Sequence, residues 1–312
     1  MKRKIMVFSS LATTLLATAV YGIVMTNKLM YIKQKDPKFI VERETKAQRF
    51  NLEWYTSCAK EELIIDSPNG YTLKGIFLKP LETNNTIIIC HGVTENKMNS
   101  IKYARMFERL GYNTFVFDHR RHGDSGGKTT SYGYYEKFDL AAIVETVRGI
   151  VGEAAIIGIH GESMGAATTL LYAGSIRDDA DFYIADCAFS DFRELLYRIV
   201  KHSIPIDLRI TVHIADIIMR MRDGYSFRSV MPIEAVTNIQ KPVLFIHSLE
   251  DKFILPSMTV EMYAAKKGPK MLKLFETGEH SQSFNENEAE YEQLVASFLN
   301  RFISTIHLSE MK

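Results

Sequence analysis

The sequence has little of several features that mark particular classes of protein. Its formal net charge is only +1 over 312 residues, so it lacks the basic field by which nucleic-acid-binding proteins attract phosphates. Its three cysteines, Cys58, Cys90 and Cys187, show no CxxC or Cys/His ligand spacing and allow at most one internal disulfide. Cys90 and Cys187 fall in apolar strand-like runs and are expected to be buried as small hydrophobic side chains. We therefore expect no metal, no cofactor and no nucleic-acid partner.

Charge is also absent from one long stretch near the N-terminus. Residues 5–27 carry no charged side chain, and a helix of that length spans a bilayer. Ala17-Thr18-Ala19 is an alternative signal-peptidase site, which would release the protein. We interpret residues 1–27 as a membrane anchor or signal segment and favour a single-pass transmembrane helix, because the apolar pattern continues beyond Ala19. The domain that follows is expected outside the cytoplasm, and secretion after cleavage is the alternative.

The rest of the chain alternates between strand-like and helix-like patterns. Two strand-like runs flank the turn-forming residues SPNGY, which predicts an antiparallel hairpin. Later β-branched runs alternate with helical spacing, which predicts an α/β fold with a mostly parallel sheet covered by helices on both faces. The expected strands are 63–66, 72–79, 86–90, 114–117, 154–159, 182–186, 243–247 and 271–275. The expected helices are 100–110, 136–150, 166–173, 258–267 and 287–303.

The segment IIGIHGESMGAATTLLY places Ser163 in a Gly-x-Ser-x-Gly turn between a strand and a helix. Gly161 and Gly165 have no Cβ, so the turn can be sharp and the strand and helix can approach closely. Such a turn presents the serine hydroxyl at the sheet edge, beside the backbone N–H of Met164. A serine hydroxyl is a poor nucleophile until a base removes its proton, so a histidine and an acid are needed at the same edge.

Polar residues from distant parts of the chain follow expected strands, at the edge where active sites of parallel sheets lie. They include His91, Asp118, Asp186, Asp251 and His280. His280 is the expected base, because among the nine histidines it alone follows a strand after the acid. Asp251 is the expected acid, with Glu250 and Asp191 as alternatives. The loop DHRRHGDSGG is expected to be structural, held by ion pairs of Asp118, Arg120 and Asp124.

The combined motifs carry a family resemblance. HGVTENK, GYNTFVFDHRRHGDSGG, GESMG, HSLEDKFILP and GEHSQSF occur in the order and spacing of the α/β-hydrolase superfamily. Residues 60–305 most resemble its bacterial serine hydrolases related to prolyl-oligopeptidase-like and Bem46-like proteins. The resemblance implies an α/β-hydrolase fold, with Ser163 as nucleophile, Asp251 as acid and His280 as base. It also implies an oxyanion hole formed by the backbone N–H groups of Val93 and Met164.

The stretch between the strands at 182–186 and 243–247 is too long for a simple crossover. Apolar residues recur there at helical spacing, which predicts a helical cap that packs over the sheet or forms the wall of an acyl pocket. The face in question contains Ile210, Ile214, Ile217, Ile218 and Met221. The chain is therefore divided into the segment 1–27, a connector 28–60, a first core part 61–190, a helical cap insertion 191–240 and a second core part 241–312.

These observations predict a serine hydrolase that cleaves carboxylic esters of small molecules or lipids by way of an acyl-enzyme. A peptidase or amidase is the first alternative, although the chain has no propeller domain of the kind found in large oligopeptidases. A non-catalytic binding protein with an α/β-hydrolase fold is the second alternative. Such a protein would need none of Ser163, Asp251 and His280, so their joint presence favours an enzyme.

Overall fold

The protein is built around one eight-stranded sheet. The computed structural model describes residues 2–201 and 208–303, and within these the side chains of residues 2–15, 201, 208 and 209 lie outside the description. The strand order is β1-β2-β4-β3-β5-β6-β7-β8. The strands are β1 (Lys60–Asp66), β2 (Thr72–Leu78), β3 (Thr86–Cys90), β4 (Asn113–Phe117), β5 (Ile157–Glu162), β6 (Phe182–Asp186), β7 (Val243–Ser248) and β8 (Lys270–Phe275).

The pairing agrees with the expected antiparallel start and parallel remainder. β1 and β2 form the hairpin, β2 is antiparallel to β4, and every pair from β4 to β8 is parallel. β3 and β6 have the predicted bounds, whereas β5 begins three residues later than expected and extends to Glu162. That extension follows from pairing, because Glu162 is in register with Asp186 at the end of β6.

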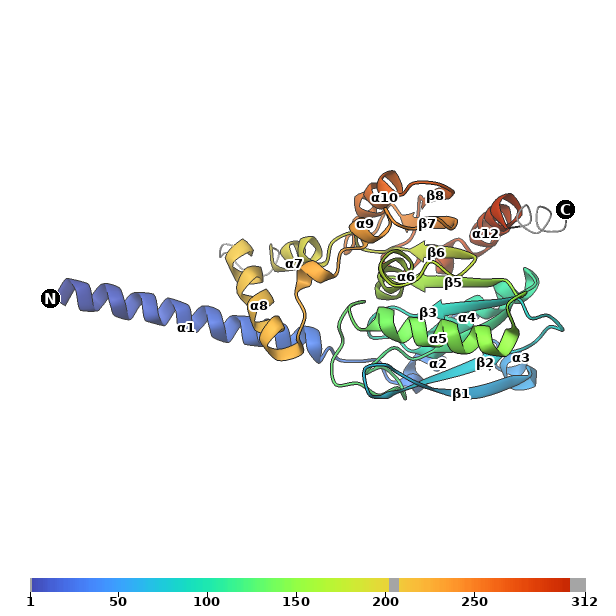
Figure 1. The fold of residues 1–312 in the computed structure, drawn as a ribbon, viewed down its shortest axis with the longest axis horizontal. Coiled ribbons are helices and arrows are strands. Elements are labelled where there is room, and N and C mark those ends of the chain that lie inside the picture. The colour runs from blue at the N-terminus through green and yellow to red at the C-terminus, as the bar shows by residue number, and fades with distance from the viewer. Residues whose placement is uncertain (1, 202–207, 304–312) are drawn as a thin grey trace.

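Helices cover both faces of the sheet, as predicted (Figure 1). One face is covered by α5 (Glu136–Val151), α6 (Met164–Ser175) and α10 (Pro256–Ala265), and the other by α4 (Lys97–Arg109) and α12 (Glu288–Phe302). In α5 the buried residues Leu140, Ile143, Val144 and Val147 recur at the three- and four-residue steps of a one-sided apolar face. β3, covered on both sides, is buried throughout and is rich in β-branched residues.

The N-terminal segment forms helix α1 (Lys2–Met30). No helix in the described part of the chain is both long enough and apolar enough to cross a membrane, so the expected transmembrane helix is not found there. Much of the predicted span falls on residues 5–15, whose side chains lie outside the description. One side of the last part of that span packs against α8 (Leu208–Asp223), because a Cβ at Gly22 would lie 2.6 Å from Ile218 Cδ1, and Met25 is buried.

The connector 28–60 is partly helical, as its sequence predicts. It contains α2 (Pro37–Lys46) and α3 (Leu52–Ser57), and the side chains of Asp36 and Asn51 cap their N-termini. Partly buried side chains of both helices pack against the α4 side of the sheet. The connector therefore forms part of the folded domain.

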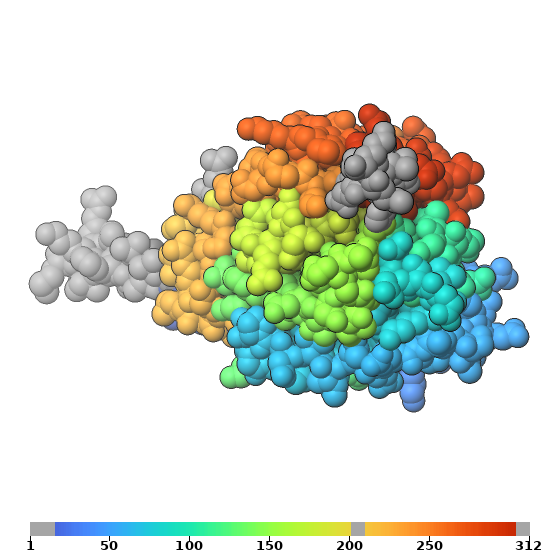
Figure 2. Space-filling model, turned by 45° about the vertical axis from the view of Figure 1, so that its right-hand side comes forward, coloured from blue at the N-terminus to red at the C-terminus, as the bar shows by residue number. Residues whose placement is uncertain are grey.

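Helices between β6 and β7 cover the end of the molecule from which α1 projects (Figure 1), and α8 forms part of the surface at that end (orange in Figure 2). They are α7 (Phe192–Lys201), α8 (Leu208–Asp223), the 3-10 turn η1 (Phe227–Ser229) and α9 (Pro232–Ala235). The predicted apolar face of α8 is wrong in register, because three of its members are exposed, namely Ile210, Ile217 and Met221. The buried stripe is Val212, Ala215 and Met219. Apolar residues occupy two adjacent stripes of this helix, so only the contacts with α1 and α7 decide which one is buried.

Candidate active site

Ser163 occupies a strained turn between β5 and α6. Its φ of 56° lies in the left-handed region, which is rare for a residue with a side chain and recurs at functional turns. A Cβ at Gly165 would overlap the carbonyl oxygen of Cys90, and one at Gly161 would overlap the backbone of Gly165. The two glycines are therefore needed for α6 to approach β3 and β5, as the sequence predicted.

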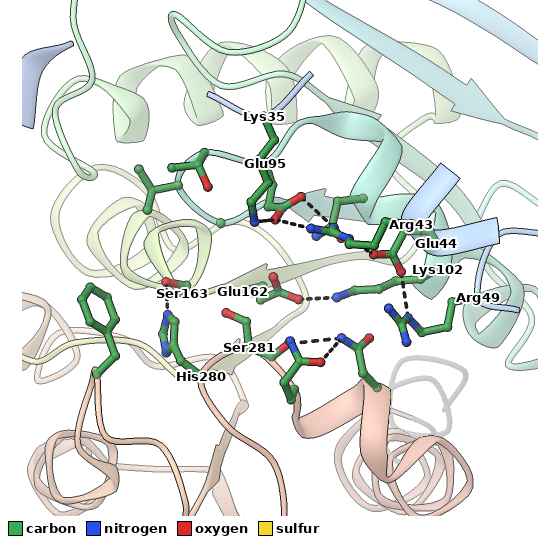
Figure 3. A pocket seen from close by; sticks show the side chains of 17 residues that line it. Lys35, Arg43, Glu44, Arg49, Glu95, Lys102, Glu162, Ser163, His280 and Ser281 are labelled. Carbon is green, nitrogen blue, oxygen red and sulfur yellow. Dashed lines mark hydrogen bonds and ion pairs between the residues drawn. The ribbon is translucent and has the colours of Figure 1, made fainter. Parts of the chain in front are cut away.

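The structure brings Ser163, His280 and Asp251 into one line of hydrogen bonds. Ser163 Oγ lies 2.8 Å from His280 Nε2, and His280 Nδ1 lies 2.7 Å from Asp251 Oδ2 (Figure 3). These residues come from the turns after β5, β8 and β7 and lie far apart in the sequence. The arrangement allows His280 to accept the proton of the Ser163 hydroxyl while the Asp251 carboxylate faces the opposite ring nitrogen.

The carboxylate of Asp251 is held by groups that the sequence did not identify. The backbone N–H groups of Phe253 and Ile254 donate to its Oδ1 at 2.9 and 3.0 Å. His247 Nε2 lies 3.0 Å from Asp251 Oδ2 and 3.0 Å from the carbonyl oxygen of Ile254. Since both neighbours are acceptors, Nε2 carries the proton and donates it. Burial favours a higher pKa for Asp251, but the hydrogen bonds from His247 and His280 outweigh it and hold that pKa well below its ordinary value.

The alternative acids make other contacts. Glu250 accepts a hydrogen bond from the backbone N–H of Gly278 at 3.1 Å. Asp191 accepts from the guanidinium of Arg193 at 3.0 Å and from the backbone N–H of the same residue at 2.7 Å. The position of His280 thus selects Asp251 over both.

The loop after β3 places Val93 beside Ser163. A Cβ at Gly92 would lie 3.5 Å from Ser163 Cβ, and Val93 lines the same cavity as Ser163. Met164 is the first residue of α6, and the first N–H groups of a helix have no partner within it. Val93 and Met164 therefore both lie beside Ser163.

Two buried neutral histidines hold this loop. His91 Nε2 accepts the backbone N–H of His119 at 3.0 Å, and its Nδ1 bonds to the carbonyl of Gly92 at 2.7 Å. His122 Nε2 accepts the backbone N–H of Thr94 at 3.3 Å. A protonated imidazole has no acceptor nitrogen, so these bonds require the neutral form. Burial lowers the pKa of both His91 and His122 to about 4.

The segment 118–127 has the expected structural role with one correction. The Lys97 ammonium pairs with Asp118 and with Asp124, each at 2.6 Å. Among the residues that the structure describes, Arg120 has no carboxylate partner within ion-pair distance, contrary to our expectation. Its guanidinium lies 4.3 Å from the centre of the Tyr135 ring and donates to Thr129 Oγ1 at 3.2 Å.

A cavity of about 330 Å³ opens in front of Ser163 and His280. The connector, which the sequence did not associate with the site, supplies part of its wall. Its charged lining residues are Lys35, Arg43, Glu44, Arg49, Glu95, Lys102 and Glu162 (Figure 3). The backbone N–H of Lys35 donates to the carbonyl of Thr94 at 3.0 Å, which ties the connector to the loop that carries Val93. Among the described residues, none from α8 lines this cavity.

A buried ion pair lies beside Ser163. Lys102 Nζ and Glu162 Oε2 are 2.7 Å apart, and the Tyr103 hydroxyl donates to the same oxygen at 2.6 Å. Burial favours a higher pKa for Glu162, but the charge and hydrogen bond of Lys102 lower it below its ordinary value. Glu162 stands next to Ser163 in the sequence, yet its partner is sixty positions away and could not be inferred from spacing.

One group of side chains in the described residues has the spacing of a metal site. Candidate ligand atoms of Cys187, Asp251 and His280 lie within 4.8 Å of one another. Asp251 and His280 are already hydrogen-bonded to each other. Burial and the nearby Asp186 raise the pKa of Cys187 well above its ordinary value, so its sulfur is a protonated thiol and a poor ligand. Cys90 and Cys187 are buried, as expected, and both are free cysteines.

Comparisons with known proteins give a consistent result. A family model for the alpha/beta hydrolase fold matches residues 85–202. The uncharacterized protein YqkD of Bacillus subtilis (strain 168) is 44% identical over 301 residues, which cover 96% of this chain and 98% of YqkD. The solved structure of the Pyrococcus furiosus esterase Pf2001 has a TM-score of 0.65 at 22% identity and covers 81% of this chain and 96% of its own. A Pyrococcus horikoshii acylaminoacyl peptidase has a TM-score of 0.59 at 18% identity and covers 80% of this chain and 43% of its own.

Replacing Gly165 with alanine is expected to lower the free energy of unfolding by about 3 kcal/mol or more, because the new Cβ overlaps backbone. Gly149→Ala is the matched control. It lies in α5 with no atom within 4 Å of the added Cβ, so alanine should stabilise the protein by up to about 1 kcal/mol. Urea denaturation of both variants measures the difference. Equal midpoints for Gly165→Ala and the wild type would show that the close approach is not required.

Acid is expected to destabilise the protein through His91 and His122. Their pKa is about 4 when folded and about 6.5 when unfolded, so the unfolded chain binds more protons between these values. Stability is therefore complete above pH ~6.5 and falls towards pH ~4, by roughly 1 kcal/mol per histidine for each pH unit. Urea midpoints measured across this range should fall less steeply for His122→Gln than for the wild type. His213→Gln, at an exposed position, is the control, and a His122→Gln slope equal to that of the wild type would contradict the assignment.

Proposed function

Because this chain belongs to the α/β-hydrolase superfamily, we propose that it is a serine hydrolase that cleaves carboxylic esters through an acyl-enzyme. The observation that carries the proposal is the continuous hydrogen-bond chain from Ser163 through His280 to Asp251, which opens into a cavity. A binding protein would require neither the strained turn at Ser163 nor a carboxylate aligned behind His280. The esterase Pf2001 has the same fold, which is compatible with this chemistry.

The proposed reaction begins when Ser163 Oγ attacks the ester carbonyl and His280 Nε2 takes its proton. The carboxylate of Asp251 keeps the remaining proton on His280 Nδ1 and stabilises the imidazolium. The N–H groups of Val93 and Met164 donate to the tetrahedral oxyanion, an interaction worth about 3 kcal/mol per donor in comparable enzymes. His280 then protonates the departing alcohol, and a water molecule activated by His280 releases the acid and restores Ser163.

His247 is proposed as a positioning residue for this machinery. It donates to Asp251 Oδ2, and its Nδ1 lies 2.7 Å from the hydroxyl of Thr259. Together with the N–H groups of Phe253 and Ile254, it keeps the Asp251 carboxylate in the orientation that meets His280. The location of the domain outside the cytoplasm, with residues 1–27 as anchor or cleaved signal, stays a prediction from the uncharged N-terminal run.

Ser163→Ala is expected to abolish hydrolysis of 4-nitrophenyl esters and labelling by a fluorophosphonate probe, because both require the hydroxyl at this turn. The fold should be retained, as judged by circular dichroism, since alanine removes only one oxygen. A panel of acyl esters and peptide amides tested on the wild type separates an esterase from a peptidase or amidase. Wild-type turnover in Ser163→Ala would exclude this serine as the nucleophile.

Asp251→Asn is expected to lower kcat by about three to four orders of magnitude, because the imidazolium loses its compensating charge and His280 its correct tautomer. Glu250→Gln is the matched control, since that residue contacts Gly278 rather than His280. Steady-state kinetics with a 4-nitrophenyl ester compares the two variants. A severe loss in Glu250→Gln with a mild one in Asp251→Asn would assign the acid to Glu250 instead.

A further inference from the structure

A second, smaller hollow adjoins the cavity at Ser163 and has an unusually basic lining. Its volume is about 190 Å³, and four basic side chains line it, namely Arg49, Lys102, Arg105 and Arg109. Glu288 is the single acidic residue among its described lining residues. Arg49 and Lys102 also line the cavity that contains Ser163 and His280, so the two spaces share a wall.

Two of these side chains have hydrogen-bond donors that remain uncommitted. Arg49 uses its Nε in a 2.7 Å bond to Glu44, and its two terminal nitrogens have no acceptor among the described residues. The Nε of Arg105 is buried without a hydrogen-bond partner, and the nearest carboxylate oxygen, on Glu108, is 3.6 Å away. Lys102 and Arg109 are already committed, to Glu162 and Glu292 respectively. Arg49 and Arg105 therefore line one small space with guanidinium groups whose donors are not all used within the described residues. Arg105 also pairs with Glu108 at 3.6 Å and lies 5.5 Å from the centre of the Trp54 ring.

Glu44 holds the Arg49 side chain in position. Glu44 is buried and bridges Arg43 and Arg49 through its two oxygens, each at 2.7 Å. The backbone N–H of Arg49 also donates to the Glu44 carbonyl at 2.9 Å. Figure 3 shows Arg49 at the opposite end of the cavity from Ser163 and His280, with Lys102 and Glu162 between them. A bound molecule could thus contact Ser163 at one end and Arg49 at the other.

We propose that Arg49 and Arg105 form an anion subsite, and that the substrate is a compact ester that carries a carboxylate or phosphate group. A planar guanidinium with free donors matches either group through paired hydrogen bonds, whereas a neutral ligand would leave these donors unsatisfied. The cavity at Ser163 has mainly charged and polar walls, with Val93 and Phe253 as its apolar side chains among the described residues, which disfavours a long acyl chain. The substrate assignment rests on the proposed hydrolase function, but the anion subsite does not.

The subsite is tested by calorimetric titration of the full chain with inorganic phosphate and, separately, with glutarate at low ionic strength. We expect at least one of these anions to bind the wild type and Ser163→Ala equally, because binding does not need the nucleophile. Arg49→Gln and Arg105→Gln should each weaken binding by about tenfold or more. Tighter binding of phosphate identifies a phosphate-bearing ester, and tighter binding of glutarate identifies a carboxylate-bearing one.

Arg177→Gln is the matched control, because Arg177 is exposed and lines a different hollow. It should bind both anions as the wild type does. Arg105→Gln leaves Glu44 and its partners intact, so it remains informative if loss of Arg49 destabilises Glu44. It removes the contacts of Arg105 with Glu108 and Trp54, so its free energy of unfolding is measured beside its anion binding. The absence of binding by either anion, or equal binding by Arg105→Gln and Arg177→Gln, would overturn the subsite.

Inhibition kinetics test whether the anion subsite belongs to the substrate site. The anion that binds should inhibit hydrolysis of a neutral 4-nitrophenyl ester competitively, and Arg105→Gln should weaken that inhibition by the same factor as binding. Binding without competition would place the anion outside the ester cavity and overturn the substrate assignment. Anion binding that persists in a protein whose Ser163 does not react with fluorophosphonate would instead refute the hydrolase and leave the subsite standing.

Discussion

The close approach of α6 to the ends of β3 and β5 is the constraint on which the rest of the site depends. Ser163 must adopt a φ of 56° for the chain to reverse direction there, and Gly165 must have no side chain for α6 to lie against Cys90. This packing fixes three things at once. It sets the direction of the Ser163 hydroxyl, the start of α6 at Met164, and the distance from Ser163 to the loop that carries Val93.

Around that turn, buried histidines hold the other groups of the site in place through hydrogen bonds. His247 donates to Asp251, and Asp251 in turn fixes His280 against Ser163. On the other side, neutral His91 and His122 accept backbone N–H groups and hold the loop after β3. His91 and His122 can accept these hydrogen bonds only in the neutral form. The loop after β3 is therefore held in place at pH values above the lowered pKa of these two histidines.

The connector completes the site from outside the sheet. Its cations form a network with one acid of the core and one of the connector itself. Lys35 and Arg43 contact Glu95, and Arg43 and Arg49 contact Glu44. Several of these groups are buried, and breaking one partner leaves an uncompensated charge, so the network specifies one arrangement of the wall. The same network leaves the outer donors of Arg49 unused. The ion pairs thus hold the cavity wall in place, while the unused donors of Arg49 can still bind an anion.

The sequence by itself determined the features that rest on local chemistry. The strand at 86–90 could be predicted because a continuous β-branched run is typical of a strand buried on both faces. The turn at Ser163 could be predicted because only glycine fits at Gly161 and Gly165. Asp251 and His280 could be placed at the same edge, since the ends of parallel strands converge there. Tertiary structure alone decided the rest. Three features depend on contacts between segments that lie far apart in the sequence: the buried stripe of α8, the ion pair of Lys102 with Glu162, and the position of Arg49 in the cavity wall. Neither periodicity nor spacing encodes which distant surface a side chain will meet.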